Sequence, residues 1–302
     1  MPQLSFCALG GGNTAVAQTD VTATYIQNPG FEEEYVRFLD INNDRGVEKP
    51  NGWSVEWYQA NADRNGMTFV ATEMNQDKIV WSAPSGNAYF GRMRWESSTI
   101  YLRQTMRDLR PGKYTLNFKA TAYTNGGGNM SVSVAGQTKN VNVESTDRSS
   151  WKGYSIDFTI PDGQKYATIE VKAERTKELF KYGIDEFTLS YDGSTYYPTI
   201  LSKAQSLYDN NKDWATDADI LAQAITDNSG KADVSDINVA IVALETAMAT
   251  FKETNTVDMT ARIVNPTFDS NINGWTCTGS SGKFQRQNST QVNFAGGFLP
   301  TT

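Results

Sequence analysis

The sequence predicts a two-sheet β-sandwich, then a three-helix bundle, then the start of a second, incomplete sandwich. Apolar and polar residues alternate in short segments over the first part of the chain. The apolar period then becomes that of a helix, and the opening motif recurs near the C-terminus. Period two indicates strands with one buried face, whereas steps of three and four indicate helices. We expect a sandwich over 18–195, a helical spacer over 196–254 and the second sandwich over 255–302.

The alternation is clear in four segments of the first sandwich. For example, Tyr114, Leu116 and Phe118 alternate with Thr115 and Asn117, which gives this segment one apolar face. The expected strands cover 114–122, 130–134, 154–160 and 167–173, with turn sequences at 110–113, 125–128 and 161–163. Regular short strands of this kind predict a sandwich.

Three helices are expected after this region. The longest has a narrow apolar seam with steps of three and four, made by Val234, Ile237, Ile241, Leu244, Met248 and Phe251. Two shorter helices are expected near 200–208 and 220–225, the second beginning at an approximate capping box from Thr216 to Asp219. No chemistry-bearing residues gather on these helices, so we expect the bundle to space two sandwiches.

An internal repeat supports the second sandwich. Residues 20–32 resemble 258–269, with six identities and an acidic match, and an Asn-Gly-Trp sequence follows each copy. We interpret this as one domain type that starts twice. Copy two reaches Thr302 about 45 residues after it starts, whereas such a sandwich needs ~100 residues. We therefore expect the chain to be a fragment of a longer protein.

The two copies differ by an insertion. Asn28 and Asn51 are 23 positions apart in copy one, but Asn265 and Asn273 are 8 positions apart in copy two. Copy one thus carries 15 extra residues within 33–50. The insertion is either a binding loop or a structural elaboration.

The N-terminus indicates export. Residues 1–19 carry no charged side chain, and Ala15-Val16-Ala17 forms a small-x-small sequence before Gln18. We interpret 1–17 as the remnant of a signal peptide, which predicts a secreted, periplasmic or cell-surface protein. The alternative is a disordered tail.

Composition excludes several function classes. The net charge of −7 argues against nucleic-acid binding, which needs clustered cations. The absence of His removes Ser-His-Asp catalysis and His-ligated zinc. The two cysteines, Cys7 and Cys277, have no metal-like spacing. No run approaches the roughly 18 apolar residues of a membrane span, so none is expected.

Five motifs occur in an order that points to a family. They are Asn28-Pro29-Gly30-Phe31-Glu32, Asn51-Gly52-Trp53, 109–116, 151–158 and 182–189. Together they resemble the galactose-binding-like jelly-roll sandwiches, particularly carbohydrate-binding modules of the xylan- and cellulose-binding type. The resemblance covers about 20–192. The segment 198–253 is similar to small helical modules of bacterial extracellular glycan-degrading enzymes and surface proteins.

The resemblance implies a structural calcium and two of its ligands. In such sandwiches a carboxylate after the opening Phe lies near one from the last strand, and these positions are Glu32 and Asp185 here. Copy two keeps Asp269 at the first position. Calcium takes hard oxygen ligands and needs no His. The alternative is that 32–34 is a solvated acidic loop.

A glycan site needs flat aromatic faces and planar polar groups. Trp53 and Trp151 match family positions that are usually in the core, and Trp57 shares strand parity with Trp53. The candidates that remain are Trp81, Arg92, Arg94, Trp95 and Tyr123. We expect them to contribute to one site bordered by the insertion. The alternative for the two arginines is an ordinary solvent face.

The expected function is non-catalytic glycan binding in an exported multi-domain protein. No spacing singles out the carboxylate pair that a glycosidase needs, so we expect no enzyme activity. A catalytic domain beyond Thr302 is left open. The alternatives are a structural or adhesion module that binds protein, and a domain that packs against an unseen catalytic domain, since fold alone does not settle function.

Overall fold

The computed structural model describes residues 18–33, 35–39, 46–59, 69–72, 82–86, 88–94, 98–145, 150–176, 180–255, 283–288 and 291–295. The expected signal-peptide remnant lies outside them. Copy two is described only as the hairpin of β14 (Lys283–Asn288) and β15 (Gln291–Ala295).

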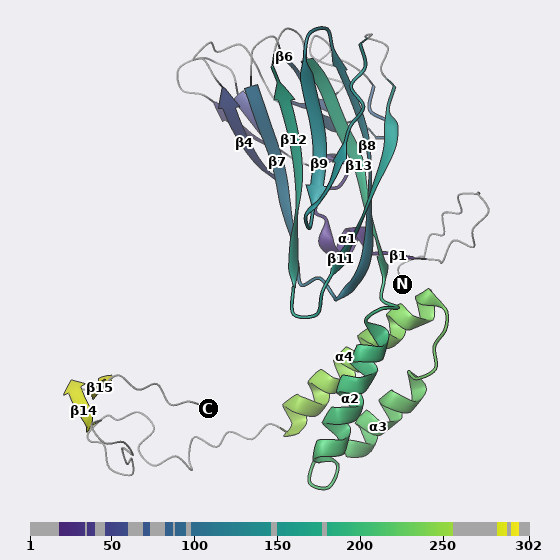
Figure 1. Cartoon of the computed structure of the whole chain (residues 1–302), viewed down its shortest axis with the longest axis vertical. Coiled ribbons are helices and arrows are strands. Elements are labelled where there is room, and N and C mark those ends of the chain that lie inside the picture. The colour runs from purple at the N-terminus through teal and green to yellow at the C-terminus, as the bar shows by residue number, and fades with distance from the viewer. Residues whose placement is uncertain are drawn as a thin grey trace.

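Two antiparallel sheets form the sandwich (Figure 1). The first sheet has the order β11 (Lys152–Ile160), β8 (Gly112–Thr124), β13 (Phe180–Asp192), β6 (Ala88–Arg94) and β5 (Phe69–Thr72), and β1 (Thr19–Asp20) also pairs with β13. The second sheet has the order β10 (Gln137–Asn140), β9 (Gly128–Val134), β12 (Tyr166–Arg175), β7 (Ser98–Arg107) and β4 (Ser54–Gln59). The short helix α1 (Thr22–Tyr25) follows β1. The predicted β-sandwich followed by helices is confirmed.

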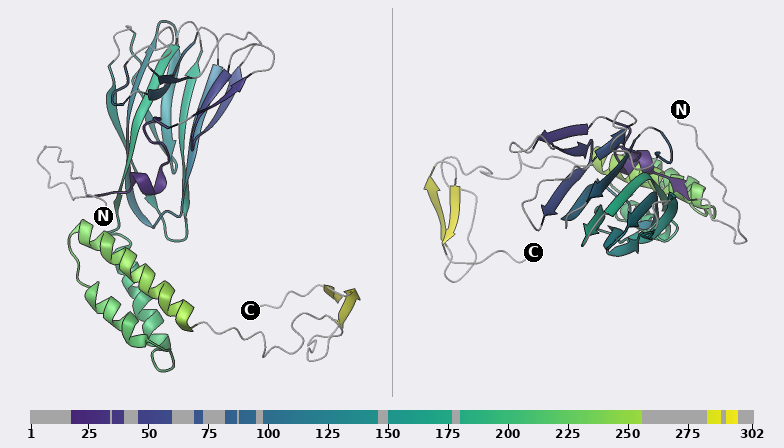
Figure 2. Two further views of the ribbon diagram at one scale, coloured as in Figure 1. Left: turned by 180° about the vertical axis from the view of Figure 1, so that it is seen from behind. Right: turned by 90° about the horizontal axis from the view of Figure 1, so that it is seen from above.

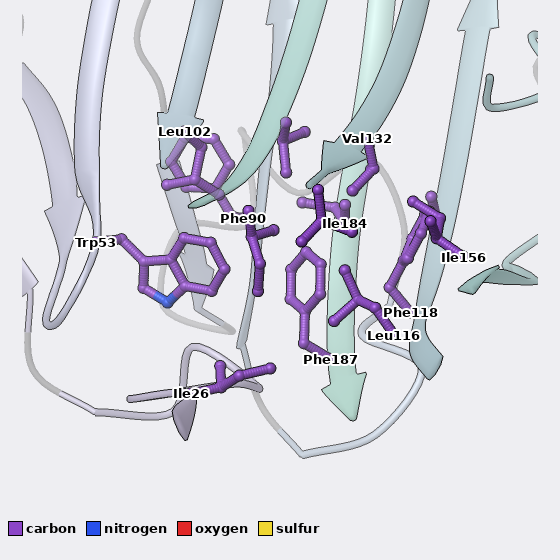
Figure 3. Packing of buried hydrophobic residues seen from close by; sticks show 14 of the residues in the cluster. Ile26, Trp53, Phe90, Leu102, Leu116, Phe118, Val132, Ile156, Ile184 and Phe187 are labelled. Carbon is purple, nitrogen blue, oxygen red and sulfur yellow. The ribbon is translucent and has the colours of Figure 1, made fainter. Parts of the chain in front are cut away.

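The apolar residues that alternate along the strands are buried between the two sheets. The even-numbered residues of β8 from Tyr114 to Ala122 enter the core, whereas the odd-numbered residues up to Lys119 face outward. The core centres on an aromatic cluster that includes Trp53 and Phe187, whose rings lie 5.1 Å apart (Figure 3). The Phe31 and Trp53 rings lie 5.4 Å apart. Trp53 is fully buried and its Nε1 donates to the Asn28 carbonyl at 3.2 Å, so its predicted core role is confirmed.

The insertion in copy one forms a hairpin of β2 (Tyr35–Leu39) and β3 (Gly46–Pro50), in which Tyr35 pairs with Pro50. Side chains close its base. The Glu33 amide donates to Asn28 Oδ1 at 3.1 Å, and Asn51 Nδ2 donates to Glu33 Oε2 at 2.7 Å. Both ends of the hairpin therefore meet at one place, which explains how copy two can connect the same motifs with the short spacing.

The three long helices are α2 (Tyr197–Asn211), α3 (Ala218–Asp227) and α4 (Val234–Asn255), and they pack against one another. The predicted capping box is wrong. Asp217 at the start of α3 has a φ of 59° and makes no capping hydrogen bond. Thr216 instead exchanges two hydrogen bonds with Asn255, with its amide donating to Asn255 Oδ1 at 2.7 Å and its carbonyl accepting from Asn255 Nδ2 at 3.0 Å. Thr216 thus ties the start of α3 to the end of α4.

By length and composition alone, α4 is apolar enough to cross a membrane. In this structure its apolar seam is the core of the bundle, where Ile237, Ile241 and Leu244 pack with Ile200 and Ala204 of α2. A core helix meets the same criterion as a membrane span, so this is weak evidence for a span. The bundle lies against the end of the sandwich that carries α1 and β1 (Figure 2).

Deleting residues 34–48 gives copy one the spacing of copy two and is expected to leave the sandwich folded. The closing residues Glu33 and Asn51 and the core residues Phe31 and Trp53 all lie outside the deletion. Near-UV circular dichroism and thermal unfolding check this. The comparison variant is Trp53→Ala, which empties a core site and should cost about 3–5 kcal/mol of stability. A deletion variant that unfolds while Trp53→Ala stays native would contradict the expectation.

Candidate functional site

Asp185 lies where β13 carries a bulge. It pairs with Lys119 of β8, and the register then shifts between Asp185 and Thr188, with Glu186 at a φ of 52°. A bulge redirects the side chains around it. Here it returns Phe187 to the core and leaves Asp185 on the outer face of the six-stranded sheet, beside Thr121.

Asp185 is buried without a hydrogen-bond partner. Its exposed fraction is 1%, and neither carboxylate oxygen has a partner within the described residues. The buried Thr121 hydroxyl is also unpaired. Buried polar groups are ordinarily paired because desolvation penalises an unpaired one. The two Asp185 carboxylate oxygens and the Thr121 hydroxyl oxygen are therefore three buried, unpaired oxygen atoms on one face. Hard cations prefer oxygen ligands of this kind.

Glu32 lies at the same place. A Cβ atom on Gly30 would be 3.8 Å from Asp185 Oδ1 and 3.9 Å from Glu32 Cγ, so both side chains approach Gly30. Glu32 Oε1 also accepts from the Ala88 amide at 3.0 Å. The chain reaches this arrangement because Phe31 has a φ of 57°, with its ring in the core and the exposed Glu32 next to it. The structure brings the two predicted calcium residues together.

Burial raises the pKa of Asp185 from 3.8 to about 8. The negative charges of Glu186 and Glu32 contribute to this rise, while the nearby Glu186 amide and the Lys119 ammonium oppose it. Without a cation the carboxyl is therefore largely protonated at neutral pH. Within the described chain no three His, Cys, Asp or Glu side chains form a metal cluster, so a calcium here would also need backbone carbonyls.

A second feature of the outer face is an aromatic patch, formed by Tyr89, Tyr123, Trp151 and Lys181. Gly91 pairs with Gly183, and the Trp151 ring lies over Gly183, where a Cβ atom would be 2.7 Å from Trp151 Cη2. The Trp151 and Tyr89 rings pack edge to face at 5.1 Å. Trp151 Nε1 donates to the Ser82 carbonyl at 2.7 Å. The indole is thus half-buried and fixed in place.

Tyr123 extends the patch toward the end of β8. It is half-buried and pairs with Lys181, whose Nζ lies 5.7 Å from the centre of its ring. Glu144 forms a bridge to Tyr123 in the backbone, and its carboxylate binds Lys152 and accepts from Asn142 Nδ2 at 2.8 Å. Aromatic rings, a carboxylate and an amide therefore meet at one end of the sheet.

The other predicted glycan residues are only partly placed. Trp81 and Trp95 lie outside the described residues, although Ser82, which follows Trp81, is the residue that Trp151 binds. The register pairs Arg92 with Tyr182 and Arg94 with Phe180, whereas Tyr123 pairs with Lys181. Tyr182 and Phe180 are buried between the sheets, and Lys181 is not. The backbone therefore does not group the arginines with Tyr123, and the single site formed by all five residues stays a prediction.

Sequence reasoning assigned Trp151 to the core, but it is half-buried on the outer face. The signal that it missed is the paired glycines Gly91 and Gly183, which have meaning only once the register of β6 and β13 is known. The pair leaves a shallow strip without side chains, and the indole fills it.

The outer face of the five-stranded sheet carries a different arrangement. Arg103 donates to Glu56 and Glu170 at 2.6 Å each and stacks on Tyr101, with its Cζ 4.4 Å from the ring centre. The positive charge of Arg103 is thus balanced by the carboxylates of Glu56 and Glu170. A half-exposed ion-pair network of this kind is typical of a solvated face.

No family model matches the chain, and neither does any curated protein. Carbohydrate-binding modules are among the solved structures that resemble it. TmCBM61 in complex with β-1,4-galactotriose has 20% identity and a TM-score of 0.39, covering 56% of this chain and 98% of that chain. The CBM22-1 xylan-binding domain of Paenibacillus barcinonensis Xyn10C has 13% identity and a TM-score of 0.28, covering 54% and 90%. The K3 adhesin domain of Lys-gingipain from Porphyromonas gingivalis has 12% identity and a TM-score of 0.33, covering 52% and 98%.

Removing divalent cations should expose the titration of Asp185. Its folded pKa of about 8 exceeds the ordinary 3.8, so the folded state holds this proton more tightly than the unfolded state. The stabilisation is complete below pH 4 and is lost as the pH rises to 8, by at most about 1.4 kcal/mol per pH unit. Melting temperatures in EDTA should therefore fall more steeply between pH 5 and 8 in the wild type than in Asp185→Asn. Parallel curves would contradict this assignment.

Proposed function

We propose that the sandwich is a non-catalytic glycan-binding module of an exported multi-domain protein. The aromatic patch of Tyr89, Tyr123, Trp151 and Lys181 is the observation that supports this function. Two of its rings, Tyr123 and Trp151, are half-buried on an outer face instead of in the core. Aromatic faces of this kind bind the apolar faces of sugar rings.

The patch is organised before any ligand arrives. Trp151 is held by its bond to Ser82 and by its contact with Tyr89, so binding would cost little side-chain entropy. The half-buried Glu144 and the exposed Asn142 lie beside Tyr123 and supply planar groups suited to sugar hydroxyls. The combination of fixed rings and surrounding hydrogen-bonding groups favours a glycan over a purely apolar ligand.

We also propose that Glu32 and Asp185 hold a calcium ion, which would neutralise the buried carboxylate. The ion would brace the segment that supports the patch. Glu32 binds the amide of Ala88, Ser85 bonds to Glu186, and Ser82 accepts from Trp151. The Glu32 and Asp185 carboxylates and the aromatic patch thus contact the same segment, at 82–86 and Ala88.

A specific observation favours the alternative, a module that binds protein. Four large apolar side chains on the helical part are exposed: Trp214 by 64%, Ile220 by 62%, Val239 by 68% and Val242 by 42%. Exposed apolar side chains become a protein interface where they form one contiguous patch, so this alternative requires that the four lie on one surface. Glycan binding remains the better-supported function because the patch combines aromatic rings with polar groups at a single place.

A glycan array with the full chain should give a hit that Trp151→Ala and Tyr123→Ala weaken. Stacking contributes about 0.5–1.5 kcal/mol beyond area burial, so each variant should lose about threefold to tenfold in affinity. Tyr101→Ala, which changes a tyrosine on the other sheet, is the matched control and should bind normally. Circular dichroism checks that each variant is folded. Equal binding by all three variants, or silence of the array, would count against the proposal.

Calcium should raise the melting temperature of the sandwich, and EDTA should lower it, because a ligand bound only by the folded state stabilises that state. Asp185→Asn should abolish the response. Asp157→Asn, at an exposed carboxylate on β11, is the matched control and should retain it. A calcium-induced shift of equal size in the wild type and in Asp185→Asn would rule out Asp185 as a calcium ligand.

A further inference from the structure

The chain between the sandwich and the helices is a packed joint. Gly193, Tyr196 and Tyr197 are buried, and the amides of both tyrosines donate to the Gly193 carbonyl at 2.9 Å. Only Gly193 to Tyr196 separate β13 from α2. The predicted boundary between 195 and 196 therefore falls inside a turn that is held from both sides.

Asn238 of α4 is the centre of this joint. Its exposed fraction is 6%, and both polar atoms of its side chain form hydrogen bonds to β1, β13 or the turn that follows β13. Its Oδ1 accepts from the Gly193 amide at 2.9 Å, and its Nδ2 donates to Thr19 Oγ1 at 2.9 Å and to the Tyr191 carbonyl at 3.0 Å. One side chain thus holds β1, the end of β13 and the turn before α2.

Packing and charge reinforce the same joint. A Cβ atom on Gly193 would collide with Ile241 and lie 2.8 Å from both Asn238 Oδ1 and the Tyr191 hydroxyl. Arg110 Nε donates to Glu245 Oε2 at 2.8 Å, which ties the turn before β8 to α4. Lys203 of α2 binds Asp162 at 2.6 Å in the turn after β11. Three separate segments of the sandwich therefore contact the two helices.

We infer that the sandwich and the helices form one cooperative folding unit, 18–255, in which Asn238 is the residue that joins them. The sandwich and bundle cores are separate apolar clusters, so the joint must couple them. Breaking the bonds of Asn238 leaves a buried amide and two backbone groups unpaired on both sides of the interface, which penalises both parts together. The helices are in this respect a fixed extension of the sandwich and not a flexible spacer.

Hydrogen exchange of the full chain under mild denaturant tests this inference. The most protected amides of β8 and of α4 should share one opening free energy, because units that open together exchange together. Asn238→Ala should speed exchange in both elements by the same factor, at least about tenfold, since several buried bonds are lost at once. Asn210→Ala, at an exposed position on α2, is the matched control and should change neither.

Two results would overturn the inference. One is faster exchange in α4 of Asn238→Ala while β8 keeps its wild-type protection. The other is proteolytic cleavage of the native wild-type chain at 193–197 that leaves both parts folded. If Asn238→Ala does not fold, Glu245→Gln is the milder variant. It removes the charge of the Arg110 partner and should speed exchange equally in β8 and α4, and an effect confined to α4 would again refute the coupling.

Discussion

The packing of Phe31, Trp53 and Phe187 between the sheets is the constraint on which most of the described structure depends. Phe31 comes from the opening turn and Phe187 from the bulge of β13, and the Phe187 amide donates to the Pro29 carbonyl at 3.0 Å. Burying these two rings fixes the residues beside them. Glu32 and Asp185 are brought together because each is within two residues of a ring that cannot leave the core. The approach of these two carboxylates is thus a consequence of core packing.

The aromatic patch likewise depends on the packing of the residues around it. Without side chains at Gly91 and Gly183, the sheet offers a strip on which an indole can lie. Trp151 occupies it, and Ser82 and Tyr89 hold it there. A larger residue at Gly183 would displace the ring. The two glycines therefore decide where the side chain just before β11 lies, and the patch and the Glu32 and Asp185 carboxylates contact the same segment, at 82–86 and Ala88.

The fold was predictable from the sequence to the extent that it depends on local pattern. Alternation identified β8, β9, β11 and β12, and the apolar steps of α4 identified the longest helix within a few residues. The approach of Glu32 and Asp185 followed from the family resemblance and not from spacing. What could not be predicted depends on register. Nothing in the sequence indicates that Gly91 pairs with Gly183 or that Arg92 pairs with Tyr182. Nor does it indicate that the Asn238 side chain forms hydrogen bonds to the sandwich instead of to solvent. Thr216 shows the same limit, because a capping signal was overridden by a tertiary partner, Asn255.

The placement of the joint and the aromatic patch has a mechanical consequence. The joint includes Arg110, two residues before the start of β8. Tyr123 lies near the other end of β8, about 36 Å from the start of the strand at about 3.3 Å per residue. If a polymer holds the Tyr123 end and the chain is anchored through α4, tension runs along β8 and its neighbours β11 and β13. The hydrogen bonds between these strands are perpendicular to that direction, so they are loaded in shear and must break together instead of one after another. A joint on the same end as the patch would instead let the strands peel apart one hydrogen bond at a time.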